Sequence, residues 1–162
     1  MIKKAYAEAI THASAVMNKW LKPFSLSLSC EKENLKGDRL GEYEMGSVFE
    51  GEIKSRIDLK KIIASAKEDN LGQDEICRQI RLTIYHETGH GLMELLIDYA
   101  ENYEEFQPLL NGDFGKKYFD IFYDDNTDEE TIVEDFARCI EGNEKSLLQL
   151  CVEETMNYLS NL

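Results

Sequence analysis

The chain has 162 residues, 43% of them hydrophobic, which is enough for one compact domain over residues 1–162 and too short for two comfortable ones. Its formal net charge of -14 at pH 7 argues against binding nucleic acid or an anionic membrane through a basic surface. An acidic chain either has an ordinary solvated surface, which is the interpretation we favour, or copies the phosphate charge of DNA.

Cysteine spacing and the first residues bear on the compartment. The four cysteines are far apart and form no Cys-x-x-Cys pair, so we expect reduced thiols rather than a zinc ribbon or a disulfide framework. Glu8, Thr11 and His12 interrupt the first segment where a signal peptide needs an unbroken apolar core. No later run approaches the ~20 apolar residues that span a bilayer. The sequence thus predicts a cytoplasmic protein.

The first elements are a helix and a strand. Apolar residues at helical spacing predict a helix from Lys4 to Leu21, closed by Pro23. His12 falls on this helix, and we interpret it as an ordinary histidine because nothing ties it to the later pair. Residues 24–30 alternate apolar and polar side chains without a break, which indicates a half-buried strand.

Two further strands are predicted, around Leu40–Met45 and over Val48–Leu59. Gly46 and Gly51 mark a turn and a bulge, and the charged residues of the later strand suggest that it lies at a sheet edge. A peptidase can hold an extended substrate by pairing its backbone with such an edge. A plain solvated edge is an equally good interpretation.

The strongest chemical signal lies on the next long helix. A short helix over residues 59–66 precedes it, and Asp74 is expected to cap the long one, which ends near Tyr99. That helix carries His86-Glu87-Thr88-Gly89-His90 inside an apolar pattern of helical period. Residues four apart project from one helical face, so His86 and His90 can share a metal ion.

Zinc chemistry explains why these residue types occur together. Zinc lowers the pKa of a bound water from ~15.7 towards ~7, and Glu87 on the same turn can act as general base. Gly89 costs about 0.5–1 kcal/mol relative to alanine inside a helix, so we expect another backbone or a substrate to pass close to it. The alternative is an exposed helix that carries two histidines by chance.

The rest of the chain is predicted to be mostly helical. Residues 100–123 are acidic and aromatic, and we interpret them as a loop with one or two short elements. A turn and N-cap at 124–128 precede a helix over 129–140, and a last helix spans about 145–159. The expected fold class is therefore α+β: an N-terminal helix, a small antiparallel sheet, the helix with the histidines, and a helical C-terminal half.

A zinc hydrolase usually binds its metal through three protein groups, so one more ligand is needed. Glu130 and Glu134 lie four apart on the predicted 129–140 helix, so that one can bind zinc while the other accepts the spare N–H of a ligand histidine. The alternative is an acidic first turn favoured by the helix dipole. Asp113 and Cys139 are the other candidates for the third ligand.

His86-Glu87-Thr88-Gly89-His90, followed by Glu130-Thr131-Ile132-Val133-Glu134-Asp135-Phe136-Ala137, resembles the gluzincin metallopeptidases, and most of all their small phage and bacterial ImmA/IrrE-type (minigluzincin-like) members. A Glu-x-x-Ala-Asn-x-Phe-Ala segment supplies the third ligand there. Glu130 matches that ligand and Phe136-Ala137 match directly, whereas Val133 and Glu134 depart. The broader Glu-x-x-x-Asp pattern likewise implies Glu130 as ligand and Glu134 as its supporting partner. The resemblance implies a zincin-like fold with Zn²⁺.

These observations predict a zinc metalloendopeptidase in which Glu87 takes a proton from water and passes it to the leaving amine. Tyr118 or Tyr123 is the candidate donor to the developing oxyanion, although each is more simply interpreted as a core aromatic. The acidic surface mildly favours cationic peptide or protein substrates. The alternatives are a non-catalytic acidic decoy that mimics DNA, and a zinc-binding protein without activity.

Overall fold

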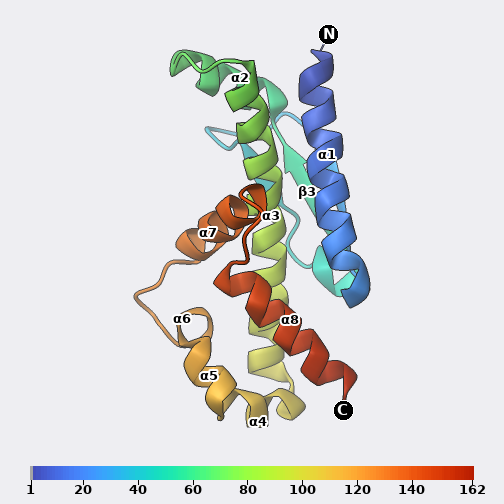
Figure 1. Cartoon of the computed structure of the whole chain (residues 1–162), viewed down its shortest axis with the longest axis vertical. Coiled ribbons are helices and arrows are strands. Elements are labelled where there is room, and N and C mark those ends of the chain that lie inside the picture. Colours follow the sequence, from blue (N-terminus) through green and yellow to red (C-terminus); the bar gives the residue numbers. More distant parts are fainter. Residues whose placement is uncertain (1) are drawn as a thin grey trace.

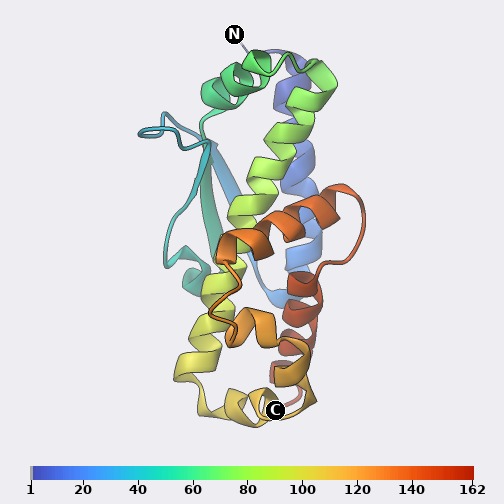
Figure 2. The ribbon, with the colours of Figure 1, turned by 90° about the vertical axis from the view of Figure 1, so that its left-hand side faces the viewer.

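The computed structural model describes residues 2–162 and has an α+β fold in which helices predominate (Figure 1). Helix α1 runs from Lys4 to Leu21, the bounds that the apolar spacing predicts. Its buried face packs against α3, and the two helices lie side by side against one face of a small sheet (Figure 2). His12 is exposed on α1.

The sheet has three strands in the order β1-β3-β2, with bounds Ser27–Lys32 for β1, Gly41–Tyr43 for β2 and Glu52–Ile57 for β3. β2 pairs antiparallel with β3, but β1 pairs parallel with it, with Leu28 opposite Ile53. The prediction of a purely antiparallel sheet is therefore wrong. Alternation of apolar and polar residues defines the faces of a strand and carries no information about the direction of its neighbour.

The prediction that the strand within residues 48–59 lies at an edge is also wrong, because β3 is the central strand. Its alternate residues Ile53, Ser55 and Ile57 are buried, and its charged residues lie on the opposite face. Residues Ser47–Glu50 form a short 3-10 helix (η2) instead of strand. Gly46 and Gly51 bound this turn with φ of 87° and 84°, so the turn at Gly46 is confirmed and Gly51 ends η2 rather than forming a bulge.

Helix α2 spans Leu59–Glu68 and is capped by Asp58, which accepts a hydrogen bond from the Lys61 backbone N–H. Helix α3 spans Gln73–Asn102 and carries both histidines of the pair. It begins one residue after Gly72, so Asp74 lies in its first turn and is not the cap. None of the described helices is both long enough and apolar enough to cross a bilayer.

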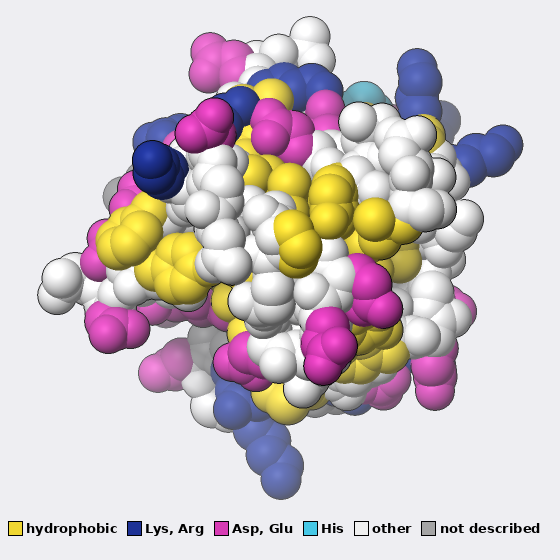
Figure 3. Space-filling view, turned by 90° about the horizontal axis from the view of Figure 1, so that it is seen from below, with side chains coloured by type: hydrophobic (Ala, Val, Ile, Leu, Met, Phe, Trp, Pro, Cys, Tyr) yellow, Lys and Arg dark blue, Asp and Glu magenta, His cyan; other side chains and the backbone are white. Residues whose placement is uncertain are grey.

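The acidic, aromatic segment after α3 is helical rather than loop. It forms a 3-10 turn and three short helices: η3 Glu104–Phe106, α4 Gln107–Leu110, α5 Asp113–Lys117 and α6 Phe119–Phe122. Ring contacts among Phe106, Phe114 and Phe122, with centroids 5.8–6.0 Å apart, hold these turns together. At this end of the molecule, apolar side chains lie between acidic ones, with basic side chains around the edge of the view (Figure 3).

Helix α7, Glu129–Glu141, crosses α3 on the side away from α1 (Figures 1 and 2), and α8, Leu147–Ser160, follows with a Ser146–Gln149 capping box. At the C-terminal end of α7, the Glu141 carboxylate accepts hydrogen bonds from Arg81 Nη2 and Nε at 2.6–3.1 Å. Because both partners are half-buried and the pair is bidentate, it fixes this end of α7 on α3.

Gly89 lies where α7 crosses α3. A Cβ placed on Gly89 would lie 3.0 Å from Val133 Cβ and 3.2 Å from a Phe136 ring carbon. Real Cβ atoms rarely approach other atoms that closely. The close approach predicted at Gly89 is confirmed, but the neighbours are side chains of helix α7 rather than a backbone or a substrate.

We expect Gly89→Ala to destabilise the protein. Alanine gains about 1 kcal/mol of helix propensity, but overpacking costs about 1–3 kcal/mol, so the free energy of unfolding should fall by up to ~2 kcal/mol. Urea denaturation measures the change. Gly142→Ala is the control. An alanine accepts the φ of -84° at this position, and its Cβ would lie no closer than 3.4 Å to a neighbouring atom. A midpoint for Gly89→Ala at or above that of the parent would contradict tight packing here.

Candidate metal centre

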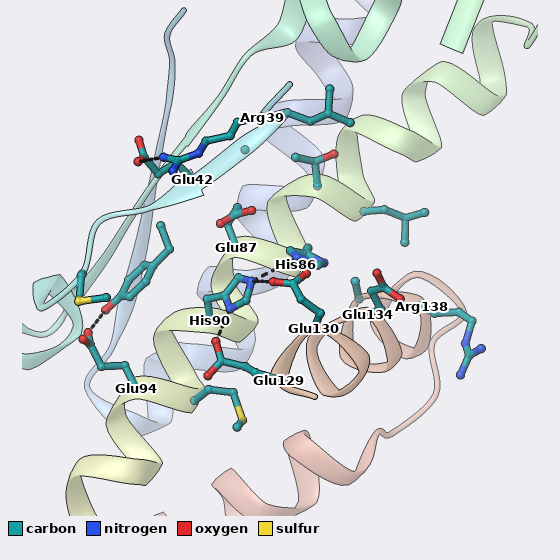
Figure 4. A pocket seen from close by; sticks show the side chains of 18 of the residues that line it. Arg39, Glu42, His86, Glu87, His90, Glu94, Glu129, Glu130, Glu134 and Arg138 are labelled. Carbon is teal, nitrogen blue, oxygen red and sulfur yellow. Dashed lines mark hydrogen bonds and ion pairs between the residues drawn. The ribbon is translucent and has the colours of Figure 1, made fainter. Parts of the chain in front are cut away.

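His86 and His90 lie one turn apart on α3, facing the start of α7 (Figure 4). Their Nε2 atoms are 3.2 Å apart, and their rings meet edge to face with centroids separated by 4.9 Å. Both side chains are about one-fifth exposed. The two imidazoles therefore direct a nitrogen each towards one point that solvent can still reach.

Glu130 completes this group from the first turn of α7. Its Oε2 atom is 2.9 Å from His86 Nε2, and its Oε1 atom is 2.9 Å from His90 Nε2. Asp128 caps α7 and accepts a hydrogen bond from the Glu130 backbone N–H at 3.2 Å, which fixes where the Glu130 side chain leaves the helix. The structure thus brings together the three residues predicted as metal ligands.

The geometry of these donors fits a zinc ion. Zinc–nitrogen bonds of about 2.0–2.1 Å at tetrahedral angles separate ligand nitrogens by about 3.3 Å. The two Nε2 atoms are 3.2 Å apart, and each lies 2.9 Å from a Glu130 oxygen. Two imidazoles and one carboxylate are also the donor set of several zinc hydrolases, which leave the fourth position open.

Glu87 lies on the sheet side of the histidines and is only 8% exposed. Its carboxylate, His86 and His90 offer ligand atoms within 4.8 Å of one another. Burial raises the pKa of Glu87 to about 7; the neighbouring His90 opposes this rise, and the Glu130 and Glu42 charges add to it. A carboxyl group of this kind can accept and release a proton near neutral pH.

The two histidines differ in their surroundings. Burial lowers the pKa of His86, and the nearby Glu130 only partly offsets this. Burial also acts to lower the pKa of His90, but the hydrogen bond that His90 donates to Glu129, with the charges of Glu87, Glu129 and Glu130, outweighs it, so the net pKa of His90 is raised. His86 is therefore the more easily kept neutral, as a metal ligand must be.

Glu129 is the site residue that sequence reasoning missed. Its Oε2 atom lies 2.5 Å from His90 Nδ1, so it can accept the ring N–H and orient the imidazole with Nε2 free. The available signal was its place beside Glu130 in the acidic first turn of α7. An acidic first turn is also favoured by the helix dipole alone, so this signal is not specific.

Glu134 was predicted to support a ligand histidine. It lines the same cleft, one turn after Glu130, and its charge contributes to the pKa of His86. Among the described residues, it forms no hydrogen bond with either histidine, whereas Glu129 does. The structure therefore places a different carboxylate in the supporting position.

The predicted oxyanion donors lie elsewhere. Tyr118 is fully buried against Phe114, and its hydroxyl has no partner among the described residues. Tyr123 is 45% exposed after α6, and neither tyrosine lines the cleft at the histidines. The other candidate ligands do not line this cleft: Asp113 begins α5, and Cys139 has its sulfur 3.9 Å from Asp135 on α7.

The histidines line a cleft of about 1150 Å³ between β2, α3 and α7. The Leu40 C=O accepts a hydrogen bond from the Asp58 N–H, and the Glu44 N–H donates one to the Lys54 C=O. The backbone groups of Leu40 and Glu44 therefore point towards the β3 side. By antiparallel alternation, the backbone groups of Gly41 and Tyr43 point the opposite way, along the open edge of β2. Both residues line the cleft.

The site thus combines three convergent side chains that could hold a metal, a buried carboxylate beside them and an open strand edge along the same cleft. Such an arrangement can hold one divalent ion and handle a proton beside it. No protein-family model matches the chain, and no characterised protein or solved structure is significantly similar to it.

Proposed function

We propose that this chain is a zinc-dependent peptidase with a zincin-like fold, of the gluzincin type that its His-Glu-x-x-His and Glu130 segments resemble. The observation that carries the proposal is the convergence of His86, His90 and Glu130 with Glu87 buried beside them. A site that only stabilised the fold would not require a base next to its ligands.

In this proposal, His86, His90 and Glu130 hold the zinc ion. Bound there, zinc would lower the pKa of water and polarise the carbonyl of the scissile peptide bond. Glu87 takes the proton from the attacking water, holds it on its carboxylate and delivers it to the leaving amine. Glu129 keeps the His90 ring oriented through Nδ1.

The open edge of β2 is the proposed platform for an extended substrate. Peptide backbone can pair with the free groups of Gly41 and Tyr43, which lie on the side of the cleft next to Glu87. A Cβ on Gly41 would lie 3.0 Å from Glu87 Oε1, so the missing side chain keeps the strand close to the base. We therefore assign to β2 the substrate-pairing role that the sequence suggested for the strand within residues 48–59.

Metal analysis and a cleavage assay test the proposal. Untagged protein loaded with zinc and dialysed is expected to retain one zinc per chain, measured by elemental mass spectrometry. The loaded protein should cleave members of a peptide library, and a chelator should stop the cleavage. Protein that retains no zinc would refute the proposal.

A pair of isosteric variants distinguishes the two supporting carboxylates. Glu129→Gln should weaken zinc binding by ~10-fold or more, because loss of a partner that orients a ligand histidine typically costs 10–100-fold. Glu134→Gln should change it much less, since Glu134 bonds to neither histidine in the described chain. Competition with a chromophoric chelator measures both affinities. The reverse order would restore Glu134 to the supporting role.

A further inference from the structure

The cleft is lined by arginines as well as by a larger number of acidic residues. Only five arginines occur in this acidic chain, and three of them line the cleft: Arg39, Arg78 and Arg138. They come from three separate segments, before β2, in the first turns of α3 and in the last turn of α7. No lysine of the described residues lines it with them.

The three arginines share one end of the cleft. Gly41 lies against Thr83 and Tyr43 donates to Glu94, so β2 runs beside α3 in the same direction. Helix α7 runs the opposite way, from Glu130 at the histidines to Glu141 at Arg81. Residues before β2, early in α3 and late in α7 therefore lie towards the same end of the cleft, on different walls.

The other end of the cleft is apolar and acidic. Met93 and Ile97 follow His90 on α3 and line the cleft with Met45 and Phe49, which are 83% and 51% exposed. Three acidic residues of α3 line the same end: Glu94, Asp98 and Glu101. In Figure 4, Glu94 lies on the other side of the histidines from Arg138.

The exposed apolar side chains sit on a fixed segment. Glu94 Oε1 accepts hydrogen bonds from the Tyr43 hydroxyl and the Gly46 backbone N–H, both at 2.7 Å. These bonds hold the chain that carries Met45 beside α3. Apolar groups presented on an ordered segment can bind a ligand with little loss of conformational freedom.

The arginines remain available to a ligand. Each forms one pair three residues away on its own segment: Arg39 with Glu42, Arg78 with Glu75, and Arg138 with Asp135. Surface pairs of this kind are weak, because solvent screens the two charges and both side chains lose freedom when they pair. A guanidinium also has five donors, so a substrate carboxylate can add to or replace these partners.

We propose that the cleft selects peptides by their order of charge, a proposal that rests on the peptidase function above. The chosen peptide has an acidic residue on the arginine side of the scissile bond and a large apolar residue on the other side. In a peptide with the opposite order, the acidic residue would face Glu94, Asp98 and Glu101, and like charges would repel.

Distances along α3 give the expected positions of these two residues in the peptide. Arg78 precedes His86 by eight residues, or about 12 Å of helix, and an extended peptide advances about 3.3 Å per residue. The acidic residue therefore lies about three to four positions from the scissile bond. Ile97 follows His90 by about 10 Å, which puts the apolar residue within about three positions on the other side.

Two fluorogenic peptides of identical composition test this. One has a pair of glutamates near its N-terminus and a pair of leucines near its C-terminus, and the other has the two pairs exchanged. The zinc-loaded protein should cleave one order at least ~10-fold faster than the other, and the ratio should shrink as salt rises from ~0.05 to ~0.5 M. Equal cleavage of both orders would overturn the proposal.

A triple variant tests whether the three arginines cause the difference in cleavage rate between the two peptides. Arg39→Gln, Arg78→Gln and Arg138→Gln together should reduce the ratio to near one, while Lys4→Gln, Lys19→Gln and Lys67→Gln together remove the same charge away from the cleft and should preserve it. Persistence of the ratio in the arginine variant would overturn the assignment.

Binding separates this inference from the peptidase proposal. In Glu87→Gln protein, fluorescence anisotropy should show the same order preference in affinity. If the parent cleaves neither peptide but this preference is present and depends on the arginines, the charge selection stands and the peptidase proposal fails. Affinities that do not differ between the two orders refute the charge selection.

Discussion

Glu130→Ala is expected to abolish stable zinc binding. The change removes the only carboxylate whose two oxygens each lie 2.9 Å from a histidine Nε2, in the described part of the chain. Affinity should fall by more than ~100-fold, beyond the 10–100-fold typical of partners that only orient a ligand. Isothermal titration of metal-free protein with zinc measures the loss.

Glu144→Ala is the control for this loss. Glu144 is an exposed glutamate just after α7, outside the cleft, and its removal should leave zinc affinity unchanged. If Glu130→Ala retained its zinc while Glu134→Ala lost it, the assigned order of the two carboxylates would be reversed.

Glu87→Gln should have the largest effect on turnover. The amide keeps the size of the side chain and leaves His86, His90 and Glu130 in place, so fold and zinc content should match the parent. It cannot take a proton from water, and hydrolysis should slow by ~10²–10⁴-fold, the usual contribution of a general base. Initial rates on a peptide that the parent cleaves measure the change.

Glu144→Gln, the same change at an exposed position, should leave the rate unaltered. Full activity in zinc-loaded Glu87→Gln protein would refute the role of this residue as base. Loss of zinc along with activity would show instead that Glu87 supports the metal.

Local sequence determined the helices well and the sheet poorly. The bounds of α1 follow from apolar spacing and Pro23, and α7 follows from the Asp128 cap and its buried face. The central place of β3 depends on which strands meet it, a long-range property that alternation does not encode. The short helices after α3 have fewer than two turns each, too few to establish a helical period.

The same distinction applies to the site. His86, Glu87 and His90 lie on one helix, so their spacing places them together, and the convergence of Glu130 with them matches its predicted place. Whether Glu129 or Glu134 reaches His90 depends on the angle at which α7 crosses α3. Contacts across α3, such as Val133 against Gly89, set that angle, and a single sequence does not give it.

Helix α7 contacts α3 through polar side chains near both of its ends. The Arg81–Glu141 pair holds one end, and the other end meets the histidines only through Glu129 and Glu130. A zinc ion shared there would cross-link the chain between residues 90 and 130. Its contribution to folding would grow by ~1.4 kcal/mol for each tenfold rise of free zinc above Kd. At low free zinc, the start of α7 and the acidic segment before it would unfold locally before the rest of the chain. The rate at which proteases degrade the protein would then depend on the concentration of free zinc.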